Sequence, residues 1–263
     1  MLVIGVDVGA ATAKAAVVRD GEFVGSAVMP TGDNVIRAAE AIAEQAVISA
    51  GYKMADVDYV VSTGYARHYV KFADKAVSEI ICHAKGANYM LPAVRTIIDI
   101  GGQDSKVIHV RENGTVADFI MNDKCAAGTG RFLEVMAGVL NTTIDQMGAI
   151  SLTSNKPSTI TSTCTIFAET ECVSLRAEGT PREDMISGLH KAVARRVYLM
   201  GQNVGYRGDV AFTGGVAQNN GLVKHLTDCL NMQIVVPEKP QIMGALGAAL
   251  LYANTSIGKD VKK

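Results

Sequence analysis

The chain has 263 residues, of which 48% are hydrophobic and 19% charged, and its formal net charge is −1. These values are typical of a globular protein with enough core for two lobes. Lys and Arg are spread along the chain without a basic run, which argues against nucleic acid or a membrane surface as a partner. Five cysteines without a disulfide-framework spacing indicate a reducing cytoplasm. The N-terminal MLVIGVDVG lacks a basic region, so we expect a strand there and not a signal peptide.

The first 30 residues predict a hairpin sheet with a glycine-containing tip. Apolar strands are expected at 2–8, 15–18 and 22–29, with Asp20 and Gly21 forming the second turn. At the first turn, Gly9 allows close backbone approach to an anion, Lys14 could hold a phosphate, and Asp7 could orient a metal-bound water. An ordinary hairpin remains the alternative at this point.

The next segments predict a helix at 34–49 with Asn34 as its cap, a strand at 57–62 and a helix at 77–87. The helix at 77–87 contains Glu79, which could face a nucleotide. Cys82 and His83 are adjacent on that helix and therefore point to different sides. We expect both to be core or surface residues and not joint metal ligands.

Residues 94–110, VRTIIDIGGQDSKVIHV, repeat the plan of the N-terminus. In both segments an apolar strand carries an acid, then glycine, a polar turn, a lysine and a second apolar strand. Two such hairpins facing each other would grip a polyphosphate from both sides. Asn113 and Gly114 predict a turn into a strand at 116–121.

The second half of the chain is predicted to be mainly helical. We expect a mixed stretch at 144–163, helices at 164–177 and 181–203, the latter capped by Thr180, and a short strand at 210–212. The glycine-rich TGGVAQNNG then opens a helix. A strand at 233–236 and a helix of small residues at 243–253 complete the chain.

Two cysteines stand at predicted helix starts. Cys125 precedes FLEVMAGVL, and Cys164 follows the cap candidates Ser162 and Thr163. The positive end of a helix favours the thiolate, which is the form that binds metal. The two cysteines are separated by 38 residues, so their spacing alone does not define a metal site. Cys172 lies about 12 Å along the helix from Cys164 and is predicted to be a small buried residue.

Several of these segments resemble one ATPase superfamily. DVG with Lys14, DIGGQD at 99–104 and FTGGVAQN at 212–219 are similar to the phosphate 1, phosphate 2 and adenosine motifs of actin, Hsp70 and the sugar kinases. NDKCAAGTGRF and STCTIFAE closely resemble the ATP-dependent activators of 2-hydroxyacyl-CoA dehydratases, relatives of the benzoyl-CoA reductase ATPase subunits. The resemblance runs from Val3 to about Ala253.

The resemblance implies an α/β fold of two similar RNase H-like lobes around a nucleotide cleft. Together with the repeated hairpin, it predicts a first lobe at 1–93 and a second lobe at 94–242. The last helix, at about 243–256, is expected to return to the first lobe.

By position, the resemblance makes Asp7, Asp99 and Gln103 candidates around Mg²⁺ and the attacking water, with Glu79 as a further catalytic candidate. The family often has hydroxyl residues directly after the first glycine, whereas this chain has two alanines there, so backbone N–H groups are expected to bind phosphate. The residues expected to contact ATP are Gly9, Ala10, Ala11, Thr12, Lys14, Gly101, Gly102, Gln103, Asp104, Gly214, Gly215 and Gln218.

The resemblance further implies that Cys125 and Cys164 ligate one 4Fe-4S cluster shared across a homodimer. Ligand counting agrees, because such a cluster normally takes four thiolates and two per chain suffice only on a two-fold axis. The implied activity is ATP-gated transfer of an electron from ferredoxin or flavodoxin to a 2-hydroxyacyl-CoA dehydratase.

Two alternatives stay open from the sequence. One is a small-molecule kinase of the same superfamily, with Glu79 or Asp104 as base toward a sugar or amino-sugar hydroxyl. The other is an ATP-switched interaction module without redox chemistry. Neither alternative accounts for the two cysteine segments, and iron content would separate them from the activator.

Overall fold

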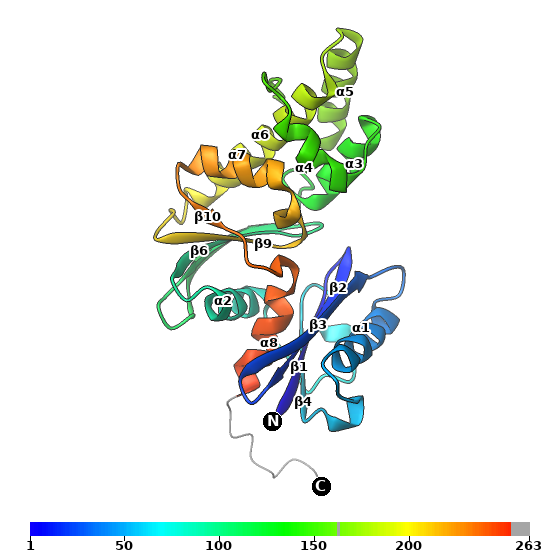
Figure 1. Ribbon diagram of the computed structural model, residues 1–263, viewed down its shortest axis with the longest axis vertical. Coiled ribbons are helices and arrows are strands. Elements are labelled where there is room, and N and C mark those ends of the chain that lie inside the picture. Colours follow the sequence, from blue (N-terminus) through cyan, green and yellow to red (C-terminus); the bar gives the residue numbers. More distant parts are fainter. Residues whose placement is uncertain (162–163, 254–263) are drawn as a thin grey trace. The chain divides into compact units, whose positions relative to one another are not determined.

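The chain folds into two compact units, each built on its own sheet. The computed structural model describes residues 1–161 and 164–253. Unit 1 comprises Met1–Pro92, Arg111–Val116 and the described part of the chain from Gln241 onward; unit 2 comprises Ala93–Val110 and Ala117–Pro240. Each unit contains a five-stranded mixed sheet with helices packed on it (Figure 1). The α/β fold class predicted from the sequence is therefore confirmed.

The sheet of unit 1 has the strand order β3-β2-β1-β4-β5. Its strands are β1 (Leu2–Val8), β2 (Thr12–Arg19), β3 (Glu22–Pro30), β4 (Tyr59–Thr63) and β5 (Lys75–Ala76). Every residue of β1 is buried, because this strand is central and both of its faces are covered by helices. The helices of the unit are α1 (Val35–Ser49), α2 (Glu79–Met90) and α8 (Met243–Ala253).

The two faces of β1 pack against different helices. Leu2, Ile4, Val6 and Val8 belong to the apolar cluster formed with α1. Since side chains alternate along a strand, Gly5 and Asp7 lie on the opposite face, and Gly5 there directly adjoins Ala245 of α8.

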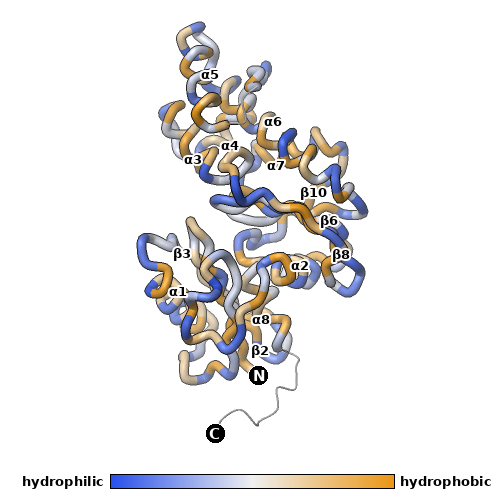
Figure 2. Tube along the Cα trace, turned by 180° about the vertical axis from the view of Figure 1, so that it is seen from behind, coloured by the Kyte–Doolittle hydropathy of each residue, from blue (hydrophilic) through white to orange (hydrophobic). Residues whose placement is uncertain are grey.

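Glycines let α8 approach its neighbours at backbone distance. A Cβ atom added at Gly247 would lie 1.7 Å from the Cys82 carbonyl oxygen, and one at Gly86 would lie 2.1 Å from the Met243 carbonyl oxygen. At Gly5 it would lie 1.9 Å from the carbonyl oxygen of Ala245. Figure 2 shows the hydrophobic character of α8. The helix is therefore held by contacts between backbones, which no larger residue at these positions could reproduce.

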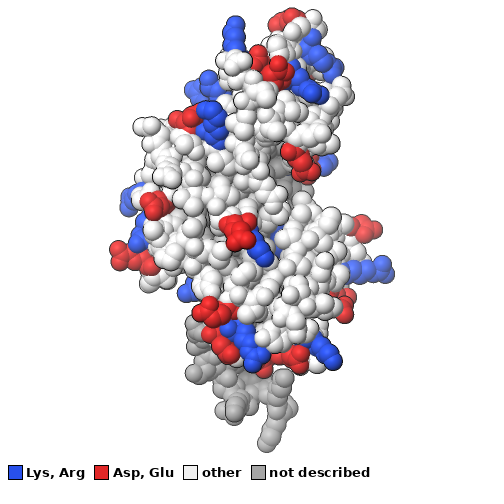
Figure 3. Space-filling view, in the orientation of Figure 1, with Lys and Arg blue, Asp and Glu red and all other residues white. Residues whose placement is uncertain are grey.

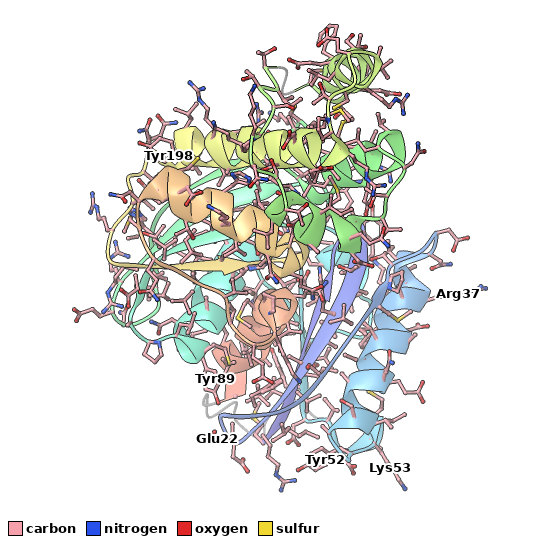
Figure 4. All side chains as sticks on the ribbon, turned by 45° about the horizontal axis from the view of Figure 1, so that its top comes forward. Glu22, Arg37, Tyr52, Lys53, Tyr89 and Tyr198 are labelled. Atoms are coloured by element: carbon pink, nitrogen blue, oxygen red, sulfur yellow. The ribbon has the colours of Figure 1, made fainter. Side chains whose placement is uncertain are left out.

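The helix cap and the hairpin turn predicted from the sequence of unit 1 are present in the structure. Asn34 caps α1, and its side chain accepts hydrogen bonds from the backbone N–H groups of Ile36 and Arg37, each at 3.1 Å. Asp20 and Gly21 both have positive φ, as a tight hairpin turn requires. At the end of α2, the Tyr89 hydroxyl donates to Glu22 of the first hairpin at 3.4 Å, and Figure 4 labels both residues.

The sheet of unit 2 has the order β10-β9-β6-β7-β8. Its strands are β6 (Val94–Ile100), β7 (Ser105–Val110), β8 (Val116–Asn122), β9 (Asp209–Thr213) and β10 (Ile234–Val235). The helices are α3 (Gly130–Val139), α4 (Ile144–Leu152), α5 (Thr165–Ala177), α6 (Arg182–Gly201) and α7 (Asn220–Leu230). They share one apolar core with β6, β7 and β9.

One sequence prediction in unit 2 was wrong and another agrees with the structure. The stretch predicted to be mixed consists of the short helix α4, which buries Met147, followed by non-helical chain up to residue 161. Pro181, and not Thr180, is the N-cap of α6, since the proline backbone is still extended there. The cap candidates Ser162 and Thr163 lie outside the described residues, as do residues 254–256 of the predicted last helix. Within the described residues, no helix is both long and apolar enough to cross a membrane.

We expect Gly247→Ala to lower the free energy of unfolding by about 1–3 kcal/mol or more, because the added methyl group meets the Cys82 carbonyl and cannot be accommodated without moving α2 or α8. Gly138→Ala in α3 is the control, since its Cβ would meet nothing within 4 Å. The free energy of unfolding of the control should rise by about 0.5–1 kcal/mol, because alanine has a higher helix propensity than glycine. Urea unfolding followed by circular dichroism measures both, and equal effects would contradict the close packing of α8.

Candidate functional site

The two phosphate hairpins predicted from the sequence have the same geometry. Asp7 pairs across the strands with Lys14, and Asp99 pairs with Lys106 in the same register. Both turns are closed by the same backbone hydrogen bond, from Gly9 N–H to the Thr12 carbonyl at 3.1 Å in unit 1 and from Gly101 N–H to the Asp104 carbonyl at 3.0 Å in unit 2. The sequence repeat is thus a repeat of structure.

The repeat includes a parallel strand in each unit. The sequence predicted the strand of unit 1 but did not identify it as part of the repeat. Thr63 lies beside Asp7 on the parallel strand β4, and Thr213 lies beside Asp99 on β9. Each threonine is followed by a glycine with φ of +85° or +88°, Gly64 and Gly214. A Cβ at Gly64 would lie 2.2 Å from an Asp7 carboxylate oxygen, and one at Gly214 would lie 3.1 Å from an Asp99 carboxylate oxygen. The Thr-Gly pair that follows a strand in both units was the sequence signal that could have identified this part of the repeat.

The two carboxylates are held differently. In unit 2, the Lys106 ammonium is 3.2 Å from Asp99 Oδ2 and 2.7 Å from Asp104 Oδ2, with 2% of the lysine side chain exposed. The Thr213 hydroxyl donates to Asp99 Oδ1 at 2.8 Å. Protein groups therefore hold both oxygens of Asp99.

In unit 1, the ammonium of Lys14 is 3.8 Å from Asp7 Oδ2, and the side chain is 15% exposed. No second acid stands in this turn, because Thr12 occupies the position that Asp104 has in unit 2. Of the two hairpin lysines, Lys14 is therefore the one whose ammonium group is free to turn toward an added anion.

Side chains of α2 lie near the Asp7 carboxylate. A Cβ at Gly244 would lie 2.7 Å from Asp7 Oδ2 and 3.0 Å from His83 Nε2, so both groups face this glycine. Burial raises the pKa of the Cys82 thiol to about 12, and the nearby Asp7 and Glu79 charges add to the shift. Asp7 and Glu79, both catalytic candidates, thus lie within electrostatic reach of one thiol. The sequence had not assigned His83 to this group.

The other residues expected to contact ATP lie on turns and are exposed or partly exposed, apart from Gly214, which is buried. The adenosine segment forms a short 3-10 helix, Gly215–Gln218, followed by α7, whose N-cap Asn219 accepts a hydrogen bond from Leu222 N–H at 3.0 Å. The exposed candidates are Ala10, Ala11, Gln103, Gly215 and Gln218. The partly exposed ones are Gly9, Thr12, Gly101, Gly102 and Asp104.

Cys125 does not stand at a helix start, which corrects the sequence prediction. The helix α3 begins at Gly130 with Thr129 as its N-cap, because Gly128 adopts a positive φ and interrupts the backbone after the cysteine. Cys125 is exposed on the preceding turn, where the Asn122 side chain donates to the Cys125 carbonyl at 2.9 Å.

Cys164 stands at the start of α5, as predicted, and it is itself the N-cap of that helix. Its side chain is exposed. The other cysteines differ from this pair. Cys172 is buried, also as predicted, and burial raises the pKa of its thiol to about 11. Burial likewise raises the pKa of the partly exposed Cys229. Cys125 and Cys164 are thus the two exposed thiols among the described residues.

Among the described residues, no group of three or more His, Cys, Asp or Glu side chains is arranged to hold a metal ion. Two thiols in one chain fall short of the four that an iron–sulfur cluster normally takes.

Comparison with known proteins agrees with this geometry. Residues 4–252 match the BadF/BadG/BcrA/BcrD ATPase family. The chain belongs to this ATPase family. It is 45% identical over 251 residues to an activator of lactoyl-CoA dehydratase from Anaerotignum propionicum, covering 95% of this chain and 96% of the relative. The resemblance to dehydratase activators drawn from the sequence is thereby confirmed.

Two solved structures have the same fold as this ATPase. The structure of component A of the Acidaminococcus fermentans (R)-2-hydroxyglutaryl-CoA dehydratase has a TM-score of 0.93 and 42% identity, with 96% of this chain and 98% of that chain covered. An activator of 2-hydroxyisocaproyl-CoA dehydratase from Clostridium difficile, solved with bound ADPNP, has a TM-score of 0.91 and 41% identity, with coverages of 96% and 94%.

Lys106→Met should destabilise this ATPase by about 3–5 kcal/mol, because it leaves two carboxylates, one of them fully buried, without their shared counter-charge. Lys14→Met is the matched control in the other hairpin. Its loss should be smaller, since Lys14 contacts one carboxylate at 3.8 Å. Chemical denaturation measures both, and equal losses would contradict the different roles of the two lysines.

Proposed function

We propose that this protein is an ATP-hydrolysing activator of a 2-hydroxyacyl-CoA dehydratase, to which it passes an electron received from ferredoxin or flavodoxin in the cytoplasm. The observation that carries the proposal is the combination of two features in one chain. The duplicated Asp-turn-Lys hairpin provides groups for a nucleotide, and the two exposed thiols, Cys125 and Cys164, provide ligands for a redox centre.

Each of the two hairpins carries groups that suit MgATP. Backbone N–H groups of the turns starting at Gly9 and Gly101 would bind phosphate oxygens, together with the Lys14 ammonium. Asp7 and Asp99 would hold Mg²⁺ through its bound waters, and Gln103 would orient the attacking water. The exposed Gly215 and Gln218 would lie beside the adenosine.

A 4Fe-4S cluster would be held by Cys125 and Cys164 from each of two chains. The thiols suit this role because both are exposed and both lie on chain segments outside helix interiors, whereas Cys82 and Cys172 are buried. Four thiolates from two chains require a homodimer with the site on its axis. The exposed apolar side chains Ile166 and Phe167, directly after Cys164, favour burial in such a contact.

The bound cluster would supply one-electron chemistry, which protein side chains lack. ATP would supply the driving force, because one electron moved uphill costs about 1.4 kcal/mol for each ~59 mV. ATP can drive the transfer only if the residues at the two turns bind nucleotide with different affinities in two conformations of the chain.

Asp7→Ala and Asp99→Ala should each reduce ATP hydrolysis by about 10²-fold or more, because each variant loses a carboxylate proposed to hold the metal and the water. The exposed Asp33→Ala is the control and should leave the rate unchanged. Phosphate release at saturating MgATP measures the rate. Full activity in both variants would refute the assignment of these carboxylates.

Cys125→Ala and Cys164→Ala should each abolish the normal cluster, because each removes two of the four ligands at a shared site. Cys229→Ala is the matched control, a partly exposed cysteine that should keep its iron, and Cys82→Ala and Cys172→Ala should do so as well. Iron per dimer and mass in solution are measured after purification without oxygen. Iron retained without Cys125 or Cys164 would overturn the ligand assignment.

A further inference from the structure

The phosphate turn of unit 2 is bonded directly to the first turn of α3. The Gly101 carbonyl accepts a hydrogen bond from Gly130 N–H at 2.9 Å, and the Gly102 carbonyl accepts one from Arg131 N–H at 2.8 Å. These donors are among the first N–H groups of the helix, which have no partner within it. The helix thus begins on the turn proposed to bind a phosphate.

The same helix start is bonded to the turn that carries Cys125. Thr129, the N-cap, donates from its hydroxyl and its backbone N–H to the Ala126 carbonyl, at 2.6 and 3.0 Å. Asn122 donates from its side-chain amide to the carbonyls of Cys125 and Ala127, at 2.9 and 3.3 Å. Residues 122–131 therefore form one hydrogen-bonded segment between β8 and α3, and we call it the cysteine segment.

The opposite side of the phosphate turn is also fixed. Asp104, at the end of the turn, is paired with the buried Lys106 at 2.7 Å, and Lys106 is paired with Asp99 of β6 at 3.2 Å. A movement of the turn relative to the sheet is opposed by these ion pairs. If the turn does move, the hydrogen bonds accepted by the Gly101 and Gly102 carbonyls would transmit the movement to α3.

We propose that these two backbone hydrogen bonds couple the nucleotide state of the phosphate turn to the position of Cys125, with Gly130 as the positioning residue. The inference rests on the proposed function, because it assigns the route by which ATP reaches the thiol site. Gly130 allows this close approach: a Cβ there would lie 3.1 Å from the Gly101 carbonyl oxygen, 3.3 Å from Val216 and 3.4 Å from Gly102 Cα.

The helix offers its own matched control. Gly138 lies in the same α3, and a Cβ there would meet nothing within 4 Å. Gly130→Ala pushes the phosphate turn away from the helix start, whereas Gly138→Ala changes only helix propensity. Both variants keep the proposed cluster ligands and the proposed nucleotide-binding residues.

The experiment measures iron release to a ferrous chelator from wild-type, Gly130→Ala and Gly138→Ala proteins purified without oxygen, with and without MgATP. The affinity for MgATP is measured by calorimetry on the same samples. Wild-type and Gly138→Ala proteins should change their release rate by about fivefold or more on nucleotide binding. Gly130→Ala should still bind MgATP, but its two rates should be nearly equal.

A nucleotide effect of wild-type size in Gly130→Ala overturns the coupling, as does a wild-type protein that binds MgATP with no change in rate. If the purified chains carry no iron, the cluster proposal fails, and the alkylation rate of Cys125 in the full chain replaces iron release with the same expected ratios. If wild-type protein binds no MgATP, the proposed function fails, and the coupling with it.

Discussion

A buried ammonium group between two carboxylates fixes the phosphate turn of the second unit. Lys106 lies within hydrogen-bonding distance of both Asp99 and Asp104, and it is almost completely buried. Removing one charge from such a group leaves the others uncompensated at a cost of several kcal/mol, so the three side chains must come together when β6 and β7 pair. The turn between these strands is thereby fixed, and α3 begins on its carbonyl groups.

The first unit has the same hairpin without this restraint. Thr12 replaces the acid of the turn, and Lys14 remains at 3.8 Å from Asp7. The same strand register therefore gives a firmly held carboxylate in unit 2 and a more loosely held one in unit 1. On the face shown in Figure 3, acidic and basic side chains are intermixed and most of the surface is uncharged.

Much of the architecture could be predicted from local sequence. The spacing of acid, glycine and lysine predicted both hairpins, and Asn34 predicted the start of α1, because these signals act between residues close in the chain. The approach of Gly247 to Cys82 depends on residues far apart in sequence and has no local signal. Cys125 was misplaced because the positive φ of Gly128 delays the start of α3, and only the backbone reveals this.

The central claim is that nucleotide bound at the phosphate turns changes the environment of the thiols of Cys125 and Cys164. The most direct measurement is electron paramagnetic resonance of the protein purified without oxygen and reduced with dithionite, recorded before and after MgATP is added. The account predicts a cluster signal whose g-values shift on addition of MgATP and not on addition of Mg²⁺ alone. A reduced protein that binds MgATP but gives no cluster signal, or gives an identical spectrum in both states, would contradict it.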